Sequence, residues 1–323
     1  MTEATPAASG INRADWLRPL GPTGLTTSAL IAGGAPIGSM PEIFGYDVPA
    51  EQGISLVEDL LRSPITTIDT SNMYSDGESE RRIGAGISRL GGVPADHWIA
   101  TKVDGKDGDY SGARVRESVR ESQQRLGLDF LPLVQLHDPE FADFADLTAP
   151  GGAVDTLVEL KREGVIGVIG VAGGHTPTLQ RFLDLEVFDV LLSHNRWTLV
   201  DRGADDLFTR AFESGVAVIN AAILGGGFFV DPVHARNYGY QPVTVSTREA
   251  GIRMRDVCAS FGTDLVTAAL QFSVRDPRIA ASVVGFSKPE RIASVVASVD
   301  HPLPDELWGA LDALTPPPAD WLD

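Results

Sequence analysis

Three apolar segments of the chain each end in an ionisable residue. Asp69 ends the segment TTID, Lys102 ends WIATK and His137 ends LPLVQLH, and Tyr74 follows Asp69 by five residues. The phenol of a tyrosine has an ordinary pKa of about 10, which is too high for efficient proton transfer near neutral pH. A lysine ammonium about 4 Å from the phenol would favour the phenolate by roughly 4 kcal/mol before desolvation opposes it. These residue types could therefore protonate a carbonyl oxygen while a hydride is delivered to the carbon.

Each of the four residues has an expected role in such a site. Asp69 would keep Lys102 charged in a half-buried setting, and Lys102 would make Tyr74 a better acid. His137 would donate a hydrogen bond to the carbonyl oxygen and orient the substrate. Taken alone, each residue also has a structural interpretation, since a strand-end Asp is commonly a helix cap or turn former. The joint placement of all four favours the catalytic interpretation.

The elements that would position these residues are short apolar segments alternating with amphipathic helices. Continuous apolar runs are typical of strands buried on both faces, and the alternation predicts βα units with a parallel sheet. The absence of a linker, and of a G-x-G-x-x-G motif after the first strand, favours an α/β fold of the (β/α)8 barrel type over an open doubly wound sheet. The expected strands are residues 29–33, 66–70, 98–102, 131–137, 165–172, 188–194, 216–222 and 281–286.

The rest of the chain is assigned around this barrel. Residues 1–14 are expected to be a disordered tail, and residues 15–323 a single barrel domain. A hairpin around Pro22-Thr23-Gly24 is expected to plug the barrel from beneath, and the segment PDELWGALDAL to pack outside it. Residues 225–245 form the longest irregular stretch, of a length that is usually functional or disordered. Because active sites of such barrels lie at the carboxyl ends of the strands, Asp69, Lys102 and His137 are expected to converge there.

Composition restricts the partners and the compartment. The formal net charge is −18, so a basic footprint for nucleic acid or for an anionic membrane surface is missing. The single cysteine, Cys258, rules out an internal disulfide and fits a reducing compartment. The first residues carry acids and no apolar core, unlike a signal peptide. We therefore expect a cytoplasmic protein with a small-molecule partner, whether it is a monomer or a homo-oligomer.

Several motifs together also match a known family. They are DTSNMY followed by GESERRIGAGI, then ATKVD, RVRESVRESQQRLGLDFLPLVQLHDPE, LKREGVIGVIGVAGG and VVGFSKPERI. Over nearly its whole length the chain resembles the aldo-keto reductase superfamily. The resemblance implies a (β/α)8 barrel, a nicotinamide cofactor across the barrel mouth, and a catalytic tetrad of Asp69, Tyr74, Lys102 and His137. The segments FDVLLSHNRWTLVDR and VINAAILGGG are most similar to the aldose 1-dehydrogenase branch, whose members oxidise a sugar hemiacetal to a lactone.

The resemblance also implies where the nicotinamide would lie, and the chain departs from the common pattern there. Family members often hold the carboxamide with Ser-Asn after the fifth strand, where this chain has Ala172 and Gly173. They often stack an aromatic ring on the nicotinamide from the seventh strand, where this chain has Ala221. We expect Asn195 or Asn220 to make the carboxamide contact instead.

The phosphate end of the cofactor is expected at the segment GFSKPERI. Its candidates lead into a helix, whose N-terminus suits a phosphate, although the charged side chains could also be merely solvated. Arg291 matches a position used for the adenosine 2′-phosphate, which favours NADP, whereas Phe286 replaces a frequently polar residue and leaves NAD open. A glycine-rich segment could let backbone amides approach the pyrophosphate, or serve as a hinge. The expected residues are Leu224, Gly225, Gly285, Phe286, Ser287, Lys288 and Arg291.

Two other functions are compatible with the sequence. A metal-dependent hydrolase or lyase could use Asp69, His137 and Asp138 as ligands, but a second histidine at ligand spacing is missing, so no metal is expected. A regulatory subunit could bind the cofactor and turn over little, although the complete tetrad argues against an inactive protein. The pocket walls are expected from residues 40–46, Trp197 and the loop with Phe228, Phe229 and Tyr238. The physiological substrate and the direction of reaction are left open by the sequence.

Overall fold

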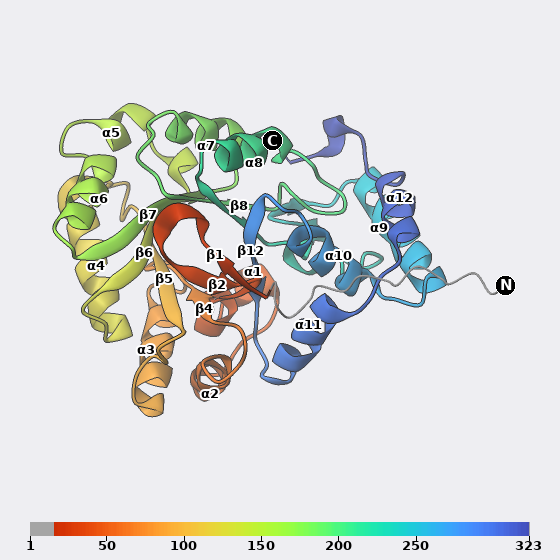
Figure 1. The fold of residues 1–323 in the computed structure, drawn as a ribbon, viewed down its shortest axis with the longest axis horizontal. Coiled ribbons are helices and arrows are strands. Elements are labelled where there is room, and N and C mark those ends of the chain that lie inside the picture. The colour runs from red at the N-terminus through yellow and green to blue at the C-terminus, as the bar shows by residue number, and fades with distance from the viewer. Residues whose placement is uncertain (1–15, 323) are drawn as a thin grey trace.

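Eight parallel strands close into a barrel in the computed structural model, which describes residues 16–322 (Figure 1). Each of the eight expected segments overlaps one barrel strand, and the (β/α)8 prediction is confirmed. In hydrogen-bonded order the strands are β12 (Ile279–Gly285), β3 (Leu30–Gly33), β4 (Thr67–Asp69), β5 (Trp98–Val103), β6 (Leu131–His137), β7 (Ile166–Gly173), β8 (Val190–His194) and β9 (Ala217–Ala221).

Apolar side chains fill the barrel and also join it to its helices. Along β5, Trp98 and Ala100 belong to the interior cluster, whereas Ile99 and Val103 pack in the outer layer against the helices. This alternation explains the continuous apolar sequence, because both faces of each strand are buried. It also directs every second residue near a strand's carboxyl end into the barrel mouth.

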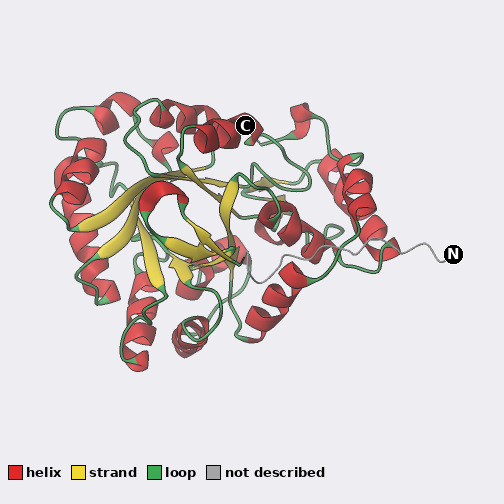
Figure 2. Ribbon diagram, viewed as in Figure 1, coloured by secondary structure: helices red, strands yellow, loops and turns green. Residues whose placement is uncertain are grey.

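Helices surround the barrel on its outside (Figure 2). Glycines with positive φ follow several helices, and the φ of Gly127 after α4 is 69°. The surrounding helices are α2 (Ala50–Leu60), α3 (Glu78–Leu90), α4 (Gly112–Leu126), α6 (Ala153–Arg162), α7 (Thr176–Leu183), α8 (Asp205–Glu213), α10 (Leu265–Val274) and α11 (Glu290–Asp300). Short helices α1 (Pro41–Phe44) and α5 (Phe144–Thr148) lie in loops, while α9 (Val245–Ser260) and α12 (Asp305–Asp312) share an apolar cluster outside the barrel.

A hairpin of β1 (Leu17–Pro19) and β2 (Thr26–Ser28) covers the amino-terminal end of the barrel. Figure 1 shows it in red across the opening that faces the viewer. Leu20 is fully buried and belongs to the interior cluster. Gly21, with φ of 56°, lies so close to the wall that a Cβ would come within 3.0 Å of the Ala217 Cβ. The predicted plug is therefore present.

The long segment after β9 is folded over the barrel and α9. It contains a 3-10 turn, Gly225–Gly227, and a small hairpin of β10 (Asn237–Tyr238) and β11 (Gln241–Pro242). Phe228, Phe229 and Tyr238 are buried in the cluster shared with α9 and α12, not exposed in a pocket as expected. Trp197 is likewise buried against Phe208 and Phe272 in the helix layer.

The expected division into a tail (1–14) and one domain (15–323) stays a prediction, because residues 1–15 and 323 lie outside the described part.

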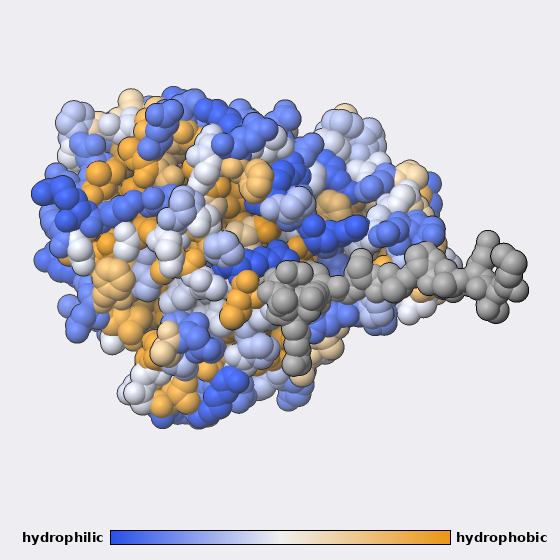
Figure 3. All heavy atoms as spheres, viewed as in Figure 1, coloured by the Kyte–Doolittle hydropathy of each residue, from blue (hydrophilic) through white to orange (hydrophobic). Residues whose placement is uncertain are grey.

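Within residues 16–322, no single helix has the length and apolar composition to cross a membrane, although α9 and α10, bent by 96°, pass that test as a pair. Figure 3 shows one face of the molecule, with apolar side chains visible over the barrel and hydrophilic ones frequent along the outline.

Candidate active site

The barrel mouth has a polar half and a half of small residues. The last inward-facing positions of β4, β5 and β6 are Asp69, Lys102 and His137, so the structure brings the three strand ends together. The corresponding positions of β7, β9, β12 and β3 have a methyl group or no side chain. These positions are Ala172, Ala221, Gly285 and Gly33.

The Lys102 ammonium is at the centre of the polar half. Its side chain is 1% exposed, and Nζ donates to Asp69 Oδ2 at 2.6 Å, to the Thr70 carbonyl at 2.8 Å and to the Tyr74 hydroxyl at 3.3 Å. An ammonium has three donors, and each has an acceptor here. Asp69 in turn accepts from Gln135 Nε2 at 3.0 Å through its other oxygen. The buried positive charge is therefore compensated and held in one place.

The loop that carries Tyr74 is fixed from the outside of the barrel. Its backbone turns through Ser75 and Asp76, both with φ of 51°, and Gly77 with φ of 79°, before α3 begins. Left-handed backbone at two non-glycine residues is strained and needs support from its surroundings. The chain turns at these residues into α3, which begins directly after Gly77.

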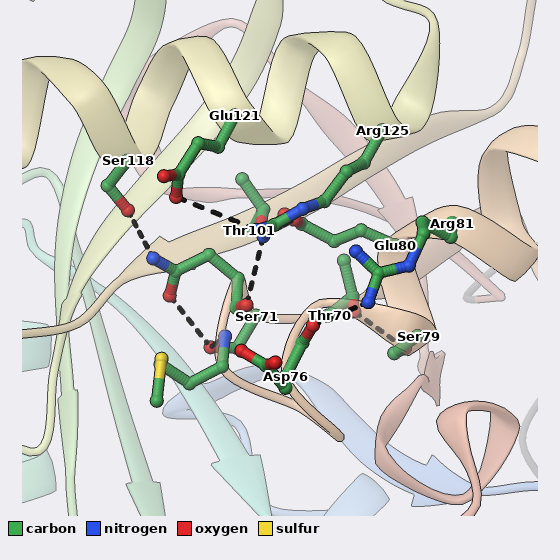
Figure 4. A network of polar contacts seen from close by, with 12 residues as sticks. Thr70, Ser71, Asp76, Ser79, Glu80, Arg81, Thr101, Ser118, Glu121 and Arg125 are labelled. Carbon is green, nitrogen blue, oxygen red and sulfur yellow. Dashed lines mark hydrogen bonds and ion pairs between the residues drawn. The ribbon is translucent and has the colours of Figure 1, made fainter. Parts of the chain in front are cut away.

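Helix α4 supplies part of that support (Figure 4). Arg125 donates to the Asn72 carbonyl at 3.1 Å and to the fully buried Glu80 of α3 at 3.2 Å, while the Asn72 amide donates to Ser118. Glu80 also accepts from Thr101 of β5 at 2.6 Å. The Tyr74 loop is thus connected to α3, α4 and β5 together.

His137 lies between two carboxylates. Its Nδ1 is 2.7 Å from Asp104 Oδ1, and its Nε2 is 3.7 Å from Asp138 Oδ2. The Tyr74 ring stands edge-on to the imidazole, with 5.7 Å between the ring centroids. The four expected residues therefore form one cluster at the mouth.

The pKa of Tyr74 does not move in the expected direction. Desolvation of the phenol, and next the negative charge of Asp69, raise the pKa of Tyr74 well above its ordinary value of 10.0. The expectation of a lowered pKa is wrong for this site, because Asp69 neutralises the Lys102 charge and adds its own field. At neutral pH Tyr74 is a neutral phenol, which can donate a proton.

The pKa values of His137 and Asp138 shift as in an ion pair, upward for the imidazole and downward for the carboxyl. Burial lowers the pKa of His137, but the carboxylates of Asp104 and Asp138 outweigh it, and the pKa lies above 6.5. Burial raises the pKa of Asp138, but the positive charge of His137 and the neighbouring His194 imidazole lower it to about 2. The imidazole is accordingly surrounded by negative charge.

Three polar residues of this cluster were missed in the sequence, namely Ser71, Asp104 and Gln135. Gln135 precedes His137 by two positions, and Asp104 follows Lys102 by two positions. Gln135 and His137 are both in β6, where alternation places them on the same face, so this spacing was the available signal for Gln135. Asp104 lies one residue beyond β5, so strand alternation does not determine where its side chain points. Ser71 donates to Asp104 Oδ2 at 2.6 Å, a contact between loops that has no sequence signature.

The two asparagines expected at the carboxamide have different surroundings. Asn220 donates to the Trp197 carbonyl and to Ser273 of α10, both at 2.8 Å, so its amide lies on the helix side of the barrel wall and not at the mouth. Asn195 follows β8 directly and lies beside His194, with 3.2 Å between Nδ2 and Nδ1. Of the two, only Asn195 remains a candidate for the mouth.

The residues expected at the cofactor's phosphates are divided between surface and core. Lys288 and Arg291 are exposed at the start of α11, and the Ser287 carbonyl accepts from Gln52. Phe286 is 1% exposed and packs in the apolar core, which accounts for an apolar residue at that position. Leu224 and Gly225 open the loop after β9, where Gly225 has φ of 61°.

The other half of the mouth is lined by residues with short side chains or none. Gly285 and Gly33 are partners in register on adjacent strands. A Cβ on Gly285 would come within 3.0 Å of Pro36 Cγ, and a Cβ on Gly33 within 3.1 Å of Val283 Cγ1, so neither position can take a side chain without displacing a neighbour. No group larger than a methyl therefore projects from these strand ends, which fits a flat ring such as nicotinamide at this edge.

Metal ligation by the expected set is not supported by the geometry. Asp69 is engaged by Lys102 and Gln135. Another group within residues 16–322, Asp138, Glu140 and His194, has ligand atoms within 4.8 Å of one another. Asp138 is already paired with the two flanking imidazoles, which accounts for this proximity without an ion.

Comparison with known proteins extends the likeness beyond these residues. The sequence model of the Aldo/keto reductase family matches residues 29–316. L-galactose dehydrogenase of Arabidopsis thaliana is 32% identical over 288 residues, which cover 88% of each chain. D-threo-aldose 1-dehydrogenase of a Pseudomonas species is 25% identical over 318 residues, covering 89% of this chain and 94% of that protein. The holo form of an aldo-keto reductase from Bacillus halodurans has the same fold, with a TM-score of 0.76 at 23% identity, covering 93% and 96% of the two chains.

The first prediction concerns the buried ion pair. Replacing Asp69 by Asn leaves the Lys102 ammonium buried without its counter-ion, and we expect the free energy of unfolding to fall by about 3–5 kcal/mol. Urea unfolding followed by circular dichroism measures the change. The control is Glu159→Gln, which breaks an exposed pair with Arg116 and should change stability by less than about 1 kcal/mol. Equal, small losses in the free energy of unfolding in both variants would show that the Lys102 ammonium does not depend on Asp69 for its compensation.

Proposed function

The chain belongs to the aldo/keto reductase family and is an oxidoreductase, and from this premise we propose that its catalytic residues are Asp69, Tyr74, Lys102 and His137. The observation that carries the proposal is the single ammonium of Lys102, which lies 2.6 Å from Asp69 Oδ2 and 3.3 Å from the Tyr74 hydroxyl. A buried lysine linked at once to a carboxylate and to a phenol is an arrangement for moving one proton.

A bound nicotinamide dinucleotide supplies or accepts the hydride. In reduction, Tyr74 donates its phenolic proton to the substrate oxygen as that oxygen becomes an alkoxide. The Lys102 ammonium stabilises the tyrosinate that is left, and Asp69 keeps the ammonium charged and in place. His137 donates a hydrogen bond to the same substrate oxygen. In oxidation the tyrosinate takes the proton from the substrate hydroxyl.

The proposed substrate is a sugar with a free C1 hemiacetal, oxidised to a lactone. This rests on the two aldose-type relatives, L-galactose dehydrogenase and D-threo-aldose 1-dehydrogenase, which align over most of this chain. Reduction of a small aldehyde or ketone is the second candidate, favoured by the raised pKa of Tyr74, because a neutral phenol donates rather than accepts a proton. The same four residues serve both directions.

The proposed cofactor is NADP. Lys288 and Arg291 lie exposed where α11 begins, and two cations there would suit the adenosine 2′-phosphate. Glu140 is proposed as an acceptor for the carboxamide. Its Oε2 has no hydrogen-bond partner within residues 16–322 and would lie 2.6 Å from a Cβ on Gly173.

The second prediction tests this cofactor preference. Arg291→Ala should weaken NADP binding by about fivefold to tenfold, the effect of an exposed charge pair with a phosphate, and leave NAD binding unchanged. Isothermal titration calorimetry with both dinucleotides measures the two dissociation constants. Arg255→Ala, on the exposed surface of α9, is the control for lost positive charge. Equal weakening of both dinucleotides by Arg291→Ala would argue against recognition of the 2′-phosphate.

The third prediction tests the tyrosine. Tyr74→Phe should lower kcat/KM by about 10²- to 10⁴-fold, because the proton donor is lost, while cofactor affinity stays within about twofold. Nicotinamide absorbance is followed with aldoses and small aldehydes and with both dinucleotides. Met73→Leu, an exposed neighbour in the same loop, is the control for disturbance of that loop.

The outcomes separate the competing functions. Equal rates for the wild type and Tyr74→Phe would mean that Tyr74 is not the proton donor. Tight cofactor binding without turnover of any substrate would support the regulatory alternative instead.

A further inference from the structure

The carboxylate of Asp104 has no part in the tetrad, yet it touches the proposed substrate-binding histidine directly. Asp104 follows β5, two positions beyond Lys102, and its side chain is 13% exposed. Oδ1 lies 2.7 Å from His137 Nδ1, and Oδ2 accepts from the Ser71 hydroxyl at 2.6 Å. Both oxygens of the carboxylate are thus held by named partners from the loop after β4 and the end of β6.

We propose that Asp104 is a positioning residue that keeps His137 doubly protonated, so that Nε2–H can donate to the substrate oxygen. The inference rests on the proposed role of His137 in binding that oxygen. It adds a residue outside the tetrad and a defined charge state for the imidazole.

The protonation state of an imidazole decides which of its two ring nitrogens can donate a hydrogen bond. An ionised carboxylate can only accept, so the 2.7 Å contact requires the proton on Nδ1. A neutral imidazole that carries its one proton on Nδ1 has an acceptor at Nε2, which cannot donate to a carbonyl oxygen. Donation from Nε2 therefore needs the imidazolium. The contact that fixes the ring also supplies the negative charge that favours this form.

The other groups around His137 also affect its protonation. Asp138 contributes negative charge from the end of β6, but at 3.7 Å from Nε2 it is beyond hydrogen-bond length and leaves this nitrogen available. His194 of β8 lies on the far side of Asp138, 3.5 Å from its Oδ1. Lys102 opposes protonation, and Tyr74 presents a ring edge. The two carboxylates together outweigh burial and Lys102, so the pKa of His137 lies above 6.5.

The sign of the pH dependence follows. His137 is a donor at Nε2 below its pKa and loses that function as the pH rises through it. Removing the charge of Asp104 lowers this pKa, so the loss of carbonyl reduction on raising the pH should begin at a lower pH. Acidic conditions should restore part of the rate, which a purely structural defect would not do.

The experiment compares Asp104→Asn, Asp104→Glu, His137→Gln and the double variant Asp104→Asn/His137→Gln. The matched control is Asp96→Asn. Asp96 also lies beside a histidine, 2.8 Å from His97 Nδ1, just before β5 begins. The first readout is the NMR titration of the His137 ring in the cofactor-free protein, assigned by its absence in His137→Gln. The second is kcat and KM for carbonyl reduction between about pH 5 and 9, a range centred on the ordinary histidine pKa.

Asp104→Asn should lower the midpoint of the His137 titration by about one pH unit or more, and should lower kcat/KM at neutral pH about 10- to 100-fold, with a smaller loss at acid pH. Asp104→Glu should retain most of the rate. In the His137→Gln background, Asp104→Asn should add less than about a twofold loss, because the two act as a unit. Asp96→Asn should leave the His137 titration unchanged.

An unchanged His137 titration in Asp104→Asn would overturn the proposal, as would a loss of rate that is equal at every pH and persists without His137. If Asp104→Asn does not fold, Ser71→Ala applies the same two readouts, since it removes the anchor of Asp104 Oδ2. Failure of the proposed function gives a different result. His137→Gln would then keep full activity, while Asp104→Asn would still lower the midpoint of the His137 titration.

Discussion

The burial of one ammonium group governs the arrangement of the barrel mouth. Lys102 is 1% exposed, and its three protons are accepted by Asp69, the Thr70 carbonyl and Tyr74. A buried charge without partners would destabilise the fold by several kcal/mol. The end of β4, the loop after it and β5 must therefore hold their relative positions. The compensation that stabilises the fold also places the phenol beside the ammonium.

The negative charges around this ammonium determine what the site can do. Burial of the phenol, and after it the charges of Asp69, Asp138 and Asp104, raise the pKa of Tyr74, while Asp104 and Asp138 raise that of His137. Both shifts favour the protonated form of the group, a phenol at Tyr74 and an imidazolium at His137. On the opposite half of the mouth, Gly285 and Gly33 are packed too closely against Pro36 and Val283 to carry side chains. In the proposed reaction this half would face the flat nicotinamide ring, and the polar half would handle the proton.

Much of the fold could be predicted because each strand is buried on both faces and reads as a continuous apolar run. The convergence of Asp69, Lys102 and His137 followed from strand ends meeting at one edge. The pair of Asp104 and His137 did not, because Asp104 lies beyond the last residue of β5 and its contact depends on a loop conformation. The expected direction of the Tyr74 pKa was wrong because the sequence showed neither how deeply the phenol is buried nor that Asp104 and Asp138 lie near it in addition to Asp69. Asn220 was misplaced because an asparagine at a strand end could face either layer.

The ionisation of Tyr74 itself tests the central claim, that the mouth holds a neutral phenol beside a neutralised ammonium. Ultraviolet difference titration of the wild type against Tyr74→Phe isolates the tyrosinate signal of this one residue in the cofactor-free protein. We expect this signal to emerge only well above pH 10.0. A tyrosinate signal that appears below that pH in the wild type and is absent from Tyr74→Phe would contradict this expectation. The positive charge of Lys102 would then have a larger effect on the pKa of Tyr74 than the carboxylates and burial.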